Sequence, residues 1–298
     1  METSTLTAEK SERRFEFTQW DSEILGEFRL NPVMDLPRLS LIMKLKGLGP
    51  TKRGRSVKAL RPRLQGLRVN GYLRRIERPR GDIPPVGRIW NRDHLIHYPT
   101  TKMWEYAHEA FMIPERVGMG DRRSNKNLDH DLNLTDLYIA LLRDLPSIGL
   151  RIKGWERLAK FVRFENGYEP DASFEFEGEF EDEEVSGKIY WEEENSAEWG
   201  YTEEGKSARV LKCDEYWPRL DKKRDRAVFC IEGETPEDAK EAAYTFAEKL
   251  HDLGGIYNKR YWFITWGDAV RENAAGYVFI SPPDYKTRTY RISGEFLE

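Results

Sequence analysis

The residues with the clearest capacity for chemistry are acids at the ends of two expected strands. Asp171 opens the strand expected over 172–177, and the strand expected over 185–191 runs into Glu192 and Glu194. An aspartate and a glutamate at adjacent strand ends can hold a divalent metal ion such as Mg²⁺ or Mn²⁺, which polarises a phosphodiester and activates water. This spacing alone carries little weight, because a chain with 52 Asp and Glu residues supplies it by chance.

A second chemical feature is a run of bases in the first third of the chain. Between Lys52 and Arg80 the only acid is Glu77, whereas residues 175–184 are rich in acids and contain no base. This asymmetry is typical of a protein in which one module binds the phosphates of a nucleic acid and another does not. The candidate DNA-binding residues in the basic run are Arg53, Arg55, Lys58, Arg61, Arg63, Gln65, Arg68, Arg74 and Arg75.

Hydrophobic spacing predicts the elements that position these bases. Three helices and a two-stranded wing are expected over Trp20–Leu30, Leu36–Leu48, Val57–Val69, Tyr72–Ile76 and Ile89–Tyr98. Ser56 is a suitable cap for the third helix, and Asn70-Gly71 is suited to end it. Pro62 and Gly66 weaken that helix, so it starts at Pro62 or is kinked there.

Residues 57–73 resemble the recognition helix and first wing strand of bacterial winged helix-turn-helix regulators. Such a helix lies in the major groove, where Arg61, Arg63 and Gln65 would reach base edges. The phosphate-contacting residues are expected to be Arg53, Arg55, Lys58, Arg74 and Arg75. The alternative is that the bases form a solvated face without a ligand.

His130 lies between two acids just before another expected helix. Thr135 is the expected cap of that helix, which runs to Leu145, and His130-Asp131 precedes it on an extended segment. A histidine flanked by acids suits a metal ligand or a general base. In the absence of other ligands nearby, a histidine that is hydrogen-bonded for structural reasons is the favoured interpretation.

The rest of the chain alternates strands and helices around a small mixed sheet. Further elements are expected over Ala208–Leu220, Ala227–Glu232, Pro236–Leu253, Tyr261–Trp266 and Tyr277–Ile280. The predicted fold class is α+β: an N-terminal winged helix-turn-helix followed by a mixed α/β domain. The predicted divisions are a disordered tail (1–14), the winged helix (15–110), a connecting segment with a helix (111–150) and the mixed α/β domain (151–298).

Composition places the chain in a reducing compartment. The 298 residues include two cysteines, Cys213 and Cys230, which are too few for a disulfide framework or a zinc ribbon. No apolar run is long enough for a membrane span, and the polar N-terminus does not read as a signal peptide. We therefore expect a cytoplasmic protein without a membrane partner, and both thiols are expected to be buried.

The order of short motifs across the chain resembles the replication-relaxation family, found on plasmids and mobile elements and including mobilisation relaxases of the MobC type. After the winged helix, the motifs that carry the resemblance are His130–Asp136, Pro170–Ala172, Tyr190–Asn195, and a helix with Lys212 and Tyr216. The resemblance spans about residues 50 to 265. It implies that the C-terminal domain (151–298) is a restriction-endonuclease-like, nuclease-like domain of the PD-(D/E)xK type. It also implies a role in plasmid replication, or in DNA relaxation and mobilisation.

The resemblance also assigns residues to the site. Asp171 becomes the first metal ligand and Glu192 the second, while Glu194 stands where an active nuclease carries its lysine. Glu194 could instead be a third metal ligand, and the missing cation could come from Lys212 or, less well placed, from Lys188. A nuclease fold that has lost its chemistry is an equal alternative.

Three functions follow. The first is a duplex-DNA-binding protein of a plasmid, phage or integrative element that recruits replication or mobilisation proteins without turnover. The second is an active metal-dependent nicking enzyme that uses Asp171, Glu192, Glu194 and Lys212. The third is a winged-helix transcription regulator whose C-terminal domain dimerises or senses a ligand. A glutamate at position 194 favours the first, and a homodimer is compatible with each.

Overall fold

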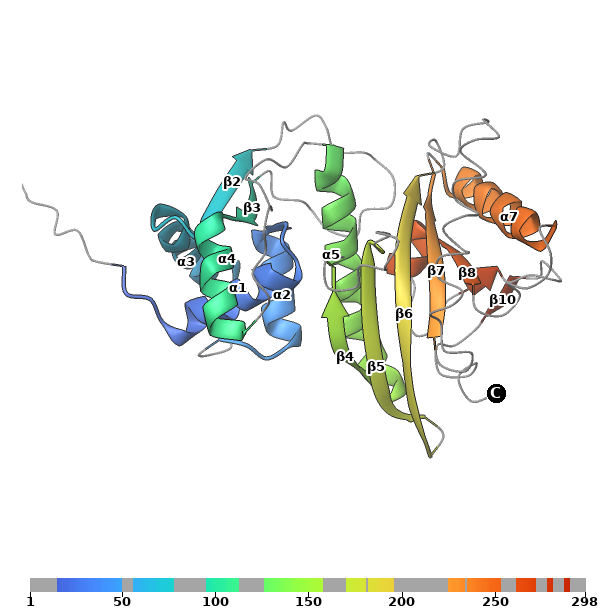
Figure 1. Ribbon diagram of the computed structural model, residues 1–298, viewed down its shortest axis with the longest axis horizontal. Helices are drawn as coiled ribbons and strands as arrows, with labels where there is room; N and C mark the ends of the chain where they lie inside the picture. Colours follow the sequence, from blue (N-terminus) through green and yellow to red (C-terminus); the bar gives the residue numbers. More distant parts are fainter. Residues whose placement is uncertain are drawn as a thin grey trace, which may run out of the picture.

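The chain is a mixed α+β protein whose described residues form two sheets. The computed structural model describes residues 15–49, 56–77, 95–112, 126–157, 170–180, 182–195, 225–233, 235–252, 261–271, 278–280 and 287–289. A three-stranded sheet has the order β1-β3-β2, and a seven-stranded sheet has the order β10-β9-β8-β7-β6-β5-β4. Helix α5 stands between the N-terminal helices and the larger sheet (Figure 1).

The N-terminal half consists of four helices and the small sheet. Its elements are α1 (Gln19–Leu30), β1 (Met34–Asp35), α2 (Leu36–Leu45), α3 (Val57–Val69), β2 (Leu73–Glu77), β3 (Leu95–Pro99) and α4 (Thr101–Phe111). Short polar side chains fix where the helices begin. The side chains of Asp35, Ser56 and Thr100 accept hydrogen bonds from the first turns of α2, α3 and α4. The three predicted helices are therefore confirmed, with small shifts at their ends.

Helix α3 begins at Val57, so the alternative start at Pro62 is wrong. The Ser56 hydroxyl accepts from the N–H of Ala59 at 3.3 Å, and this cap anchors the turn before the proline. Gly66 has a packing role, because a Cβ atom there would lie 2.3 Å from the ring of Phe15. Gly71 follows the helix with a φ of 80°, a conformation that favours glycine.

Helix α5 (Lys126–Asp144) starts earlier than expected. His130 and Asp131 lie inside the helix, and the predictions of an extended segment there and of a cap at Thr135 are wrong. The Thr135 hydroxyl instead lies 3.0 Å from the Asp131 carbonyl oxygen, one helical turn back, and 3.1 Å from that of Val33. Buried Leu128 and Leu132 extend the apolar face toward the N-terminus. A threonine can bond to the preceding turn as readily as it caps a helix, so its type alone does not locate the helix start.

The larger sheet combines antiparallel edges with a parallel centre. Its strands are β4 (Leu150–Glu156), β5 (Ala172–Phe180), β6 (Glu183–Asn195), β7 (Asp225–Glu232), β8 (Tyr261–Thr265), β9 (Val278–Ile280) and β10 (Thr287–Thr289). β6, β7 and β8 are parallel, whereas the other neighbours are antiparallel. All the predicted strands of this half are present, whereas β4 and β10 were not predicted. The helix expected over 208–220 lies outside the described residues.

The described residues of this half also form three helical segments. They are η1 (Leu145–Ile148), α7 (Pro236–Asp252) and α8 (Trp266–Arg271). Phe246 of α7 packs against Phe229 and Phe263, with ring centroids 5.2 and 5.0 Å apart. Cys230 points away from that face into the main core, where its thiol is buried as predicted. Cys213 lies outside the described residues.

One hydrophobic core joins the N-terminal helices to the sheet. The same cluster contains Leu39 of α2, Leu64 of α3, Leu137 of α5 and Phe174 of β5. Buried polar contacts cross the same junction: Arg38 pairs with both Asp35 and Asp136. The boundary drawn near Phe111 therefore separates elements that share a core, with α5 as the common layer.

Candidate nucleic-acid interface and acidic cluster

Helix α3 has one apolar face and one polar face. Leu60, Leu64 and Leu67 are buried, whereas Lys58, Arg61 and Gln65 are exposed. The buried positions recur at helical spacing, so the exposed ones must lie together on the opposite side. The arrangement presents two cations and an amide to solvent on a helix that is firmly seated in the core.

Arg63 does not belong to this exposed face, and its predicted contact with base edges is not supported. Its Nε donates to Asp21 Oδ1 at 2.8 Å, and its Nη2 also contacts Asp21 and lies 3.1 Å from Thr18 Oγ1. The guanidinium lies 5.0 Å from the centre of the Phe15 ring. Because Asp21 is fully buried, Arg63 neutralises an internal charge and fastens α3 to α1.

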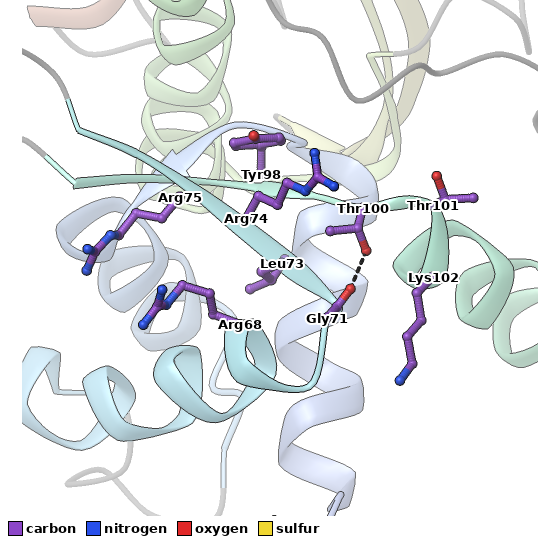
Figure 2. Close-up of a pocket in the computed structure, with 9 residues that line it drawn as sticks. All are labelled: Arg68, Gly71, Leu73, Arg74, Arg75, Tyr98, Thr100, Thr101 and Lys102. Carbon is purple, nitrogen blue, oxygen red and sulfur yellow. Dashed lines mark hydrogen bonds between the residues drawn. The ribbon is translucent and has the colours of Figure 1, made fainter.

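Three more of the predicted DNA-binding residues surround one open cavity beside α3. Arg68, Arg74 and Arg75 line it together with Lys102 from α4 (Figure 2), and its volume is about 500 Å³. Arg68 Nη2 donates to the Gln65 side-chain oxygen at 3.0 Å, which links the cavity to the exposed face of α3. Arg53 and Arg55 lie outside the described residues.

A second polar cluster forms where α5 meets the ends of β5 and β6. His130 Nε2 lies 3.3 Å from Asp171 Oδ1 and 3.9 Å from Glu193 Oε2. The backbone N–H of Glu193 donates to Asp171 Oδ2 at 2.8 Å, and Asn133 Nδ2 donates to Glu193 Oε1 at 2.6 Å. Residues from three elements thus converge on one pair of carboxylates.

The cluster holds His130 in its protonated form. Burial opposes the charge, but the hydrogen bond to Asp171 and the charges of Glu193, Asp171 and Asp131 outweigh it and raise the pKa of His130 to about 9. Asp131 itself pairs with Arg157 at 2.7 Å. An imidazolium between two carboxylates can donate a proton or hold both acids in place.

The structure brings together a different set of acids from the predicted one. Side chains alternate along a strand, so Glu193 faces α5 with Asp171, and Glu192 faces the other side. Glu192 is buried beside Phe229, which packs under α7. Lys188 is engaged elsewhere, with Nζ 3.5 Å from Glu175 and 5.3 Å from the centre of the Tyr190 ring. The side chain of Glu194 and all of Lys212 lie outside the described part of the chain.

Sequence reasoning missed His130 and Glu193 as partners of Asp171. The sequence did contain a clue to Glu193. Alternate residues of a strand lie on one face, so Glu193 shares a face of β6 with the core-facing residues Val185, Ile189 and Trp191. Within the described ranges, no three His, Cys, Asp or Glu side chains have the geometry to hold a metal ion. The cluster as described is therefore an acid and base arrangement, and a metal would have to draw on further ligands.

Comparison of the chain with protein-family models, with curated proteins and with solved structures gives no match. No helix among the described residues has the length and apolar character needed to cross a membrane. The DNA-binding function proposed below therefore rests on geometry and charge.

Proposed function

We propose that this protein binds duplex DNA, with α3 in the major groove and β2 and β3 as a wing. The order of elements α1, β1, α2, α3, β2, β3, with the strand order β1-β3-β2, supports the proposal because it is compatible with a winged helix-turn-helix. The observation that carries the proposal is the exposed face of α3. Lys58, Arg61 and Gln65 project from a helix whose other side is buried leucine.

The residues of this face have side chains suited to reading DNA. An arginine can contact guanine with two hydrogen bonds, and a glutamine can contact base edges or phosphates. Lys58 is placed one turn from Arg61 and would neutralise a phosphate. Arg68, Arg74 and Arg75 extend the positive surface onto β2, which is where a wing would follow the DNA backbone.

The biological setting remains the one suggested by the resemblance to replication-relaxation proteins. On that basis the DNA belongs to a plasmid, phage or integrative element, and the role is recognition and recruitment in replication or mobilisation. A winged-helix regulator of transcription would use the same surface. Both roles require specific duplex binding, which is the property to test first.

The test compares duplex binding by the full chain with that of Lys58→Ala/Arg61→Ala across a range of salt concentrations. Loss of the phosphate contact of Lys58 and of the base contact of Arg61 should lower affinity, and loss of the phosphate contact should reduce the slope of log affinity against log salt by about one. The matched control is Arg151→Ala/Lys153→Ala, which removes the same charge from two exposed residues of β4 that pair with Glu177. If both variants bind alike, α3 is not the DNA-binding helix.

A second candidate function is DNA nicking at the acidic cluster. The observation that favours it is that Asp171 meets Glu193 and His130 at the ends of β5 and β6, the position expected for a site of the PD-(D/E)xK type. The start of α5, the outer end of β2 and the tip of β6 lie along the same, upper side of the molecule in Figure 1. A duplex that extends from α3 and the wing along this side would reach the cluster.

Nicking is tested on supercoiled plasmid with Mg²⁺ or Mn²⁺, comparing the wild-type chain with Asp171→Asn. Loss of nicking in the variant, with duplex binding retained, supports the enzyme. Glu175→Gln is the matched control, because Glu175 is an exposed acid of β5 outside the cluster. Absence of nicking by the wild type, with binding intact, leaves the chain as a DNA-binding recruiter.

A further inference from the structure

The cavity beside α3 has the composition of an anion site. It is lined by Arg68, Gly71, Leu73, Arg74, Arg75, Tyr98, Thr100, Thr101 and Lys102. Four of these nine residues are cationic, three carry hydroxyl groups, and none is acidic. We propose that the cavity is a preformed seat for a single phosphoryl group.

The walls of the cavity are fastened to one another. Thr100 Oγ1 lies 2.6 Å from the Gly71 carbonyl oxygen (Figure 2), and the Thr100 N–H donates to the Tyr72 carbonyl at 3.1 Å. Lys102 Nζ donates to the Asn70 carbonyl at 3.0 Å and lies 4.6 Å from the centre of the Tyr72 ring. These contacts join the end of α3, the start of β2 and the start of α4. A ligand would therefore meet a surface that needs little ordering.

The donors available to a ligand suit a phosphate. The Arg68 and Arg75 side chains extend to the same side of β2 in Figure 2, and each guanidinium carries several N–H donors in a planar fork. Arg68 uses one of them on Gln65, which leaves the others for a second acceptor. The start of α4 adds backbone N–H groups and the positive end of an eleven-residue helix. Several donors on different walls match the oxygens of a tetrahedral anion better than a flat carboxylate.

Two sources could supply this group. One is a phosphodiester of bound duplex, in which case the inference rests on the proposed function. The contact of Arg68 with Gln65 places the seat next to the exposed face of α3, so a phosphate there would set the register of that helix on DNA. The other source is a small phosphate compound that occupies the seat when DNA is absent.

The test titrates the full chain with inorganic phosphate and with dimethyl phosphate, and follows the arginine side-chain N–H signals by NMR. We expect saturable shifts for the arginines of the cavity, and about tenfold weaker binding in Arg75→Gln, because a hydrogen bond between charged groups is lost. Arg75 is exposed, so the variant should fold normally. Arg151→Gln, on the distant strand β4, is the control and should bind phosphate like the wild type.

Duplex binding by the same variants separates the sources and the two proposals. If Arg75→Gln weakens both phosphate and duplex binding, the seat holds a DNA phosphate. If it weakens phosphate binding alone, the seat serves a small phosphate compound. The phosphate-site proposal is refuted if the shifts do not saturate, or if Arg75→Gln leaves phosphate binding unchanged, even when Lys58→Ala/Arg61→Ala weakens duplex binding. Conversely, if the chain binds phosphate but does not bind duplex DNA, the phosphate site is supported and the proposed function is refuted.

Discussion

Two charged regions of the molecule differ in whether their charges are exposed or paired. They are the cationic surface of α3 and β2 and the acidic cluster of β5, β6 and α5. On the first, Lys58 and Arg61 are exposed, and the cavity next to them has no acidic lining residue. In the second, the charges of Asp171 and Glu193 are paired with the imidazolium of His130 at a partly exposed site. A surface rich in cations attracts an external anion, whereas opposite charges that pair with one another stabilise the fold or serve a reaction.

The same contrast exists within a single helix. Arg61 and Arg63 are two positions apart on α3, yet among the described residues only Arg63 has an ion-pair partner, which is Asp21. Between the two regions lies a third kind of site, the ion triad of Arg38, Asp35 and Asp136, which is almost fully buried. The following predictions test whether these charges have the separate roles that their surroundings indicate.

The largest effect is expected at the buried triad. Arg38→Met leaves Asp35 and Asp136 without their common cation in a dry site, which should lower the free energy of unfolding by about 3–5 kcal/mol. Urea unfolding followed by circular dichroism measures the loss. Arg151→Met, at an exposed surface pair, should change stability by less than about 1 kcal/mol. Equal effects in the two variants would contradict the idea that the triad holds the two halves together.

Arg61 and Arg63 should separate binding from stability. Arg63→Ala leaves the buried Asp21 carboxylate without its guanidinium and should cost about 1–3 kcal/mol of stability. Arg61→Ala should alter stability by less than about 0.5 kcal/mol while weakening duplex binding. Thermal unfolding and a duplex-binding titration measure the stability and the duplex affinity of both variants. If Arg63→Ala were stable but bound duplex poorly, Arg63 would belong to the DNA interface.

Gly66→Ala should have a smaller, context-dependent effect. In the wild type the new methyl group forces the Phe15 ring from its place against α3 and Arg63, and about 1 kcal/mol of stability should be lost. In a Phe15→Ala background the same change should stabilise the helix by up to about 1 kcal/mol, because alanine favours helix over glycine. A double-mutant cycle in urea reports the reversal of sign, and the same sign in both backgrounds would refute the packing role of Gly66.

The smallest effect concerns the pH dependence of the acidic cluster. His130 has a pKa of about 9 in the folded protein, above its ordinary value of 6.5, so the folded state binds its proton more tightly. The stability that His130 contributes is therefore complete below about pH 6.5 and disappears as the pH rises through 9. Relative to His130→Gln, the wild type should lose stability between these values. Parallel stability curves from pH 6 to 9.5 would show that His130 is not held by the carboxylates.

The sequence by itself determined most of the local elements. Leu60, Leu64 and Leu67 have helical spacing, and Ser56 and Gly71 mark the ends of α3, so this helix could be located from neighbouring residues alone. The strands β5 to β8 were equally visible as short apolar runs. Information of this kind lies within a few residues of the position concerned, which is why it can be obtained without a fold.

The tertiary structure alone decided which charged residues act together. Three consecutive glutamates give no indication of which one faces a distant helix, so Glu192 was chosen where Glu193 contacts the Asp171 cluster. Nothing local distinguishes Arg63 from Arg61, because the difference is an aspartate on another helix. Electrostatic pairing depends on distances of a few ångströms between residues far apart in the chain, and only packing of the core around α5 sets those distances.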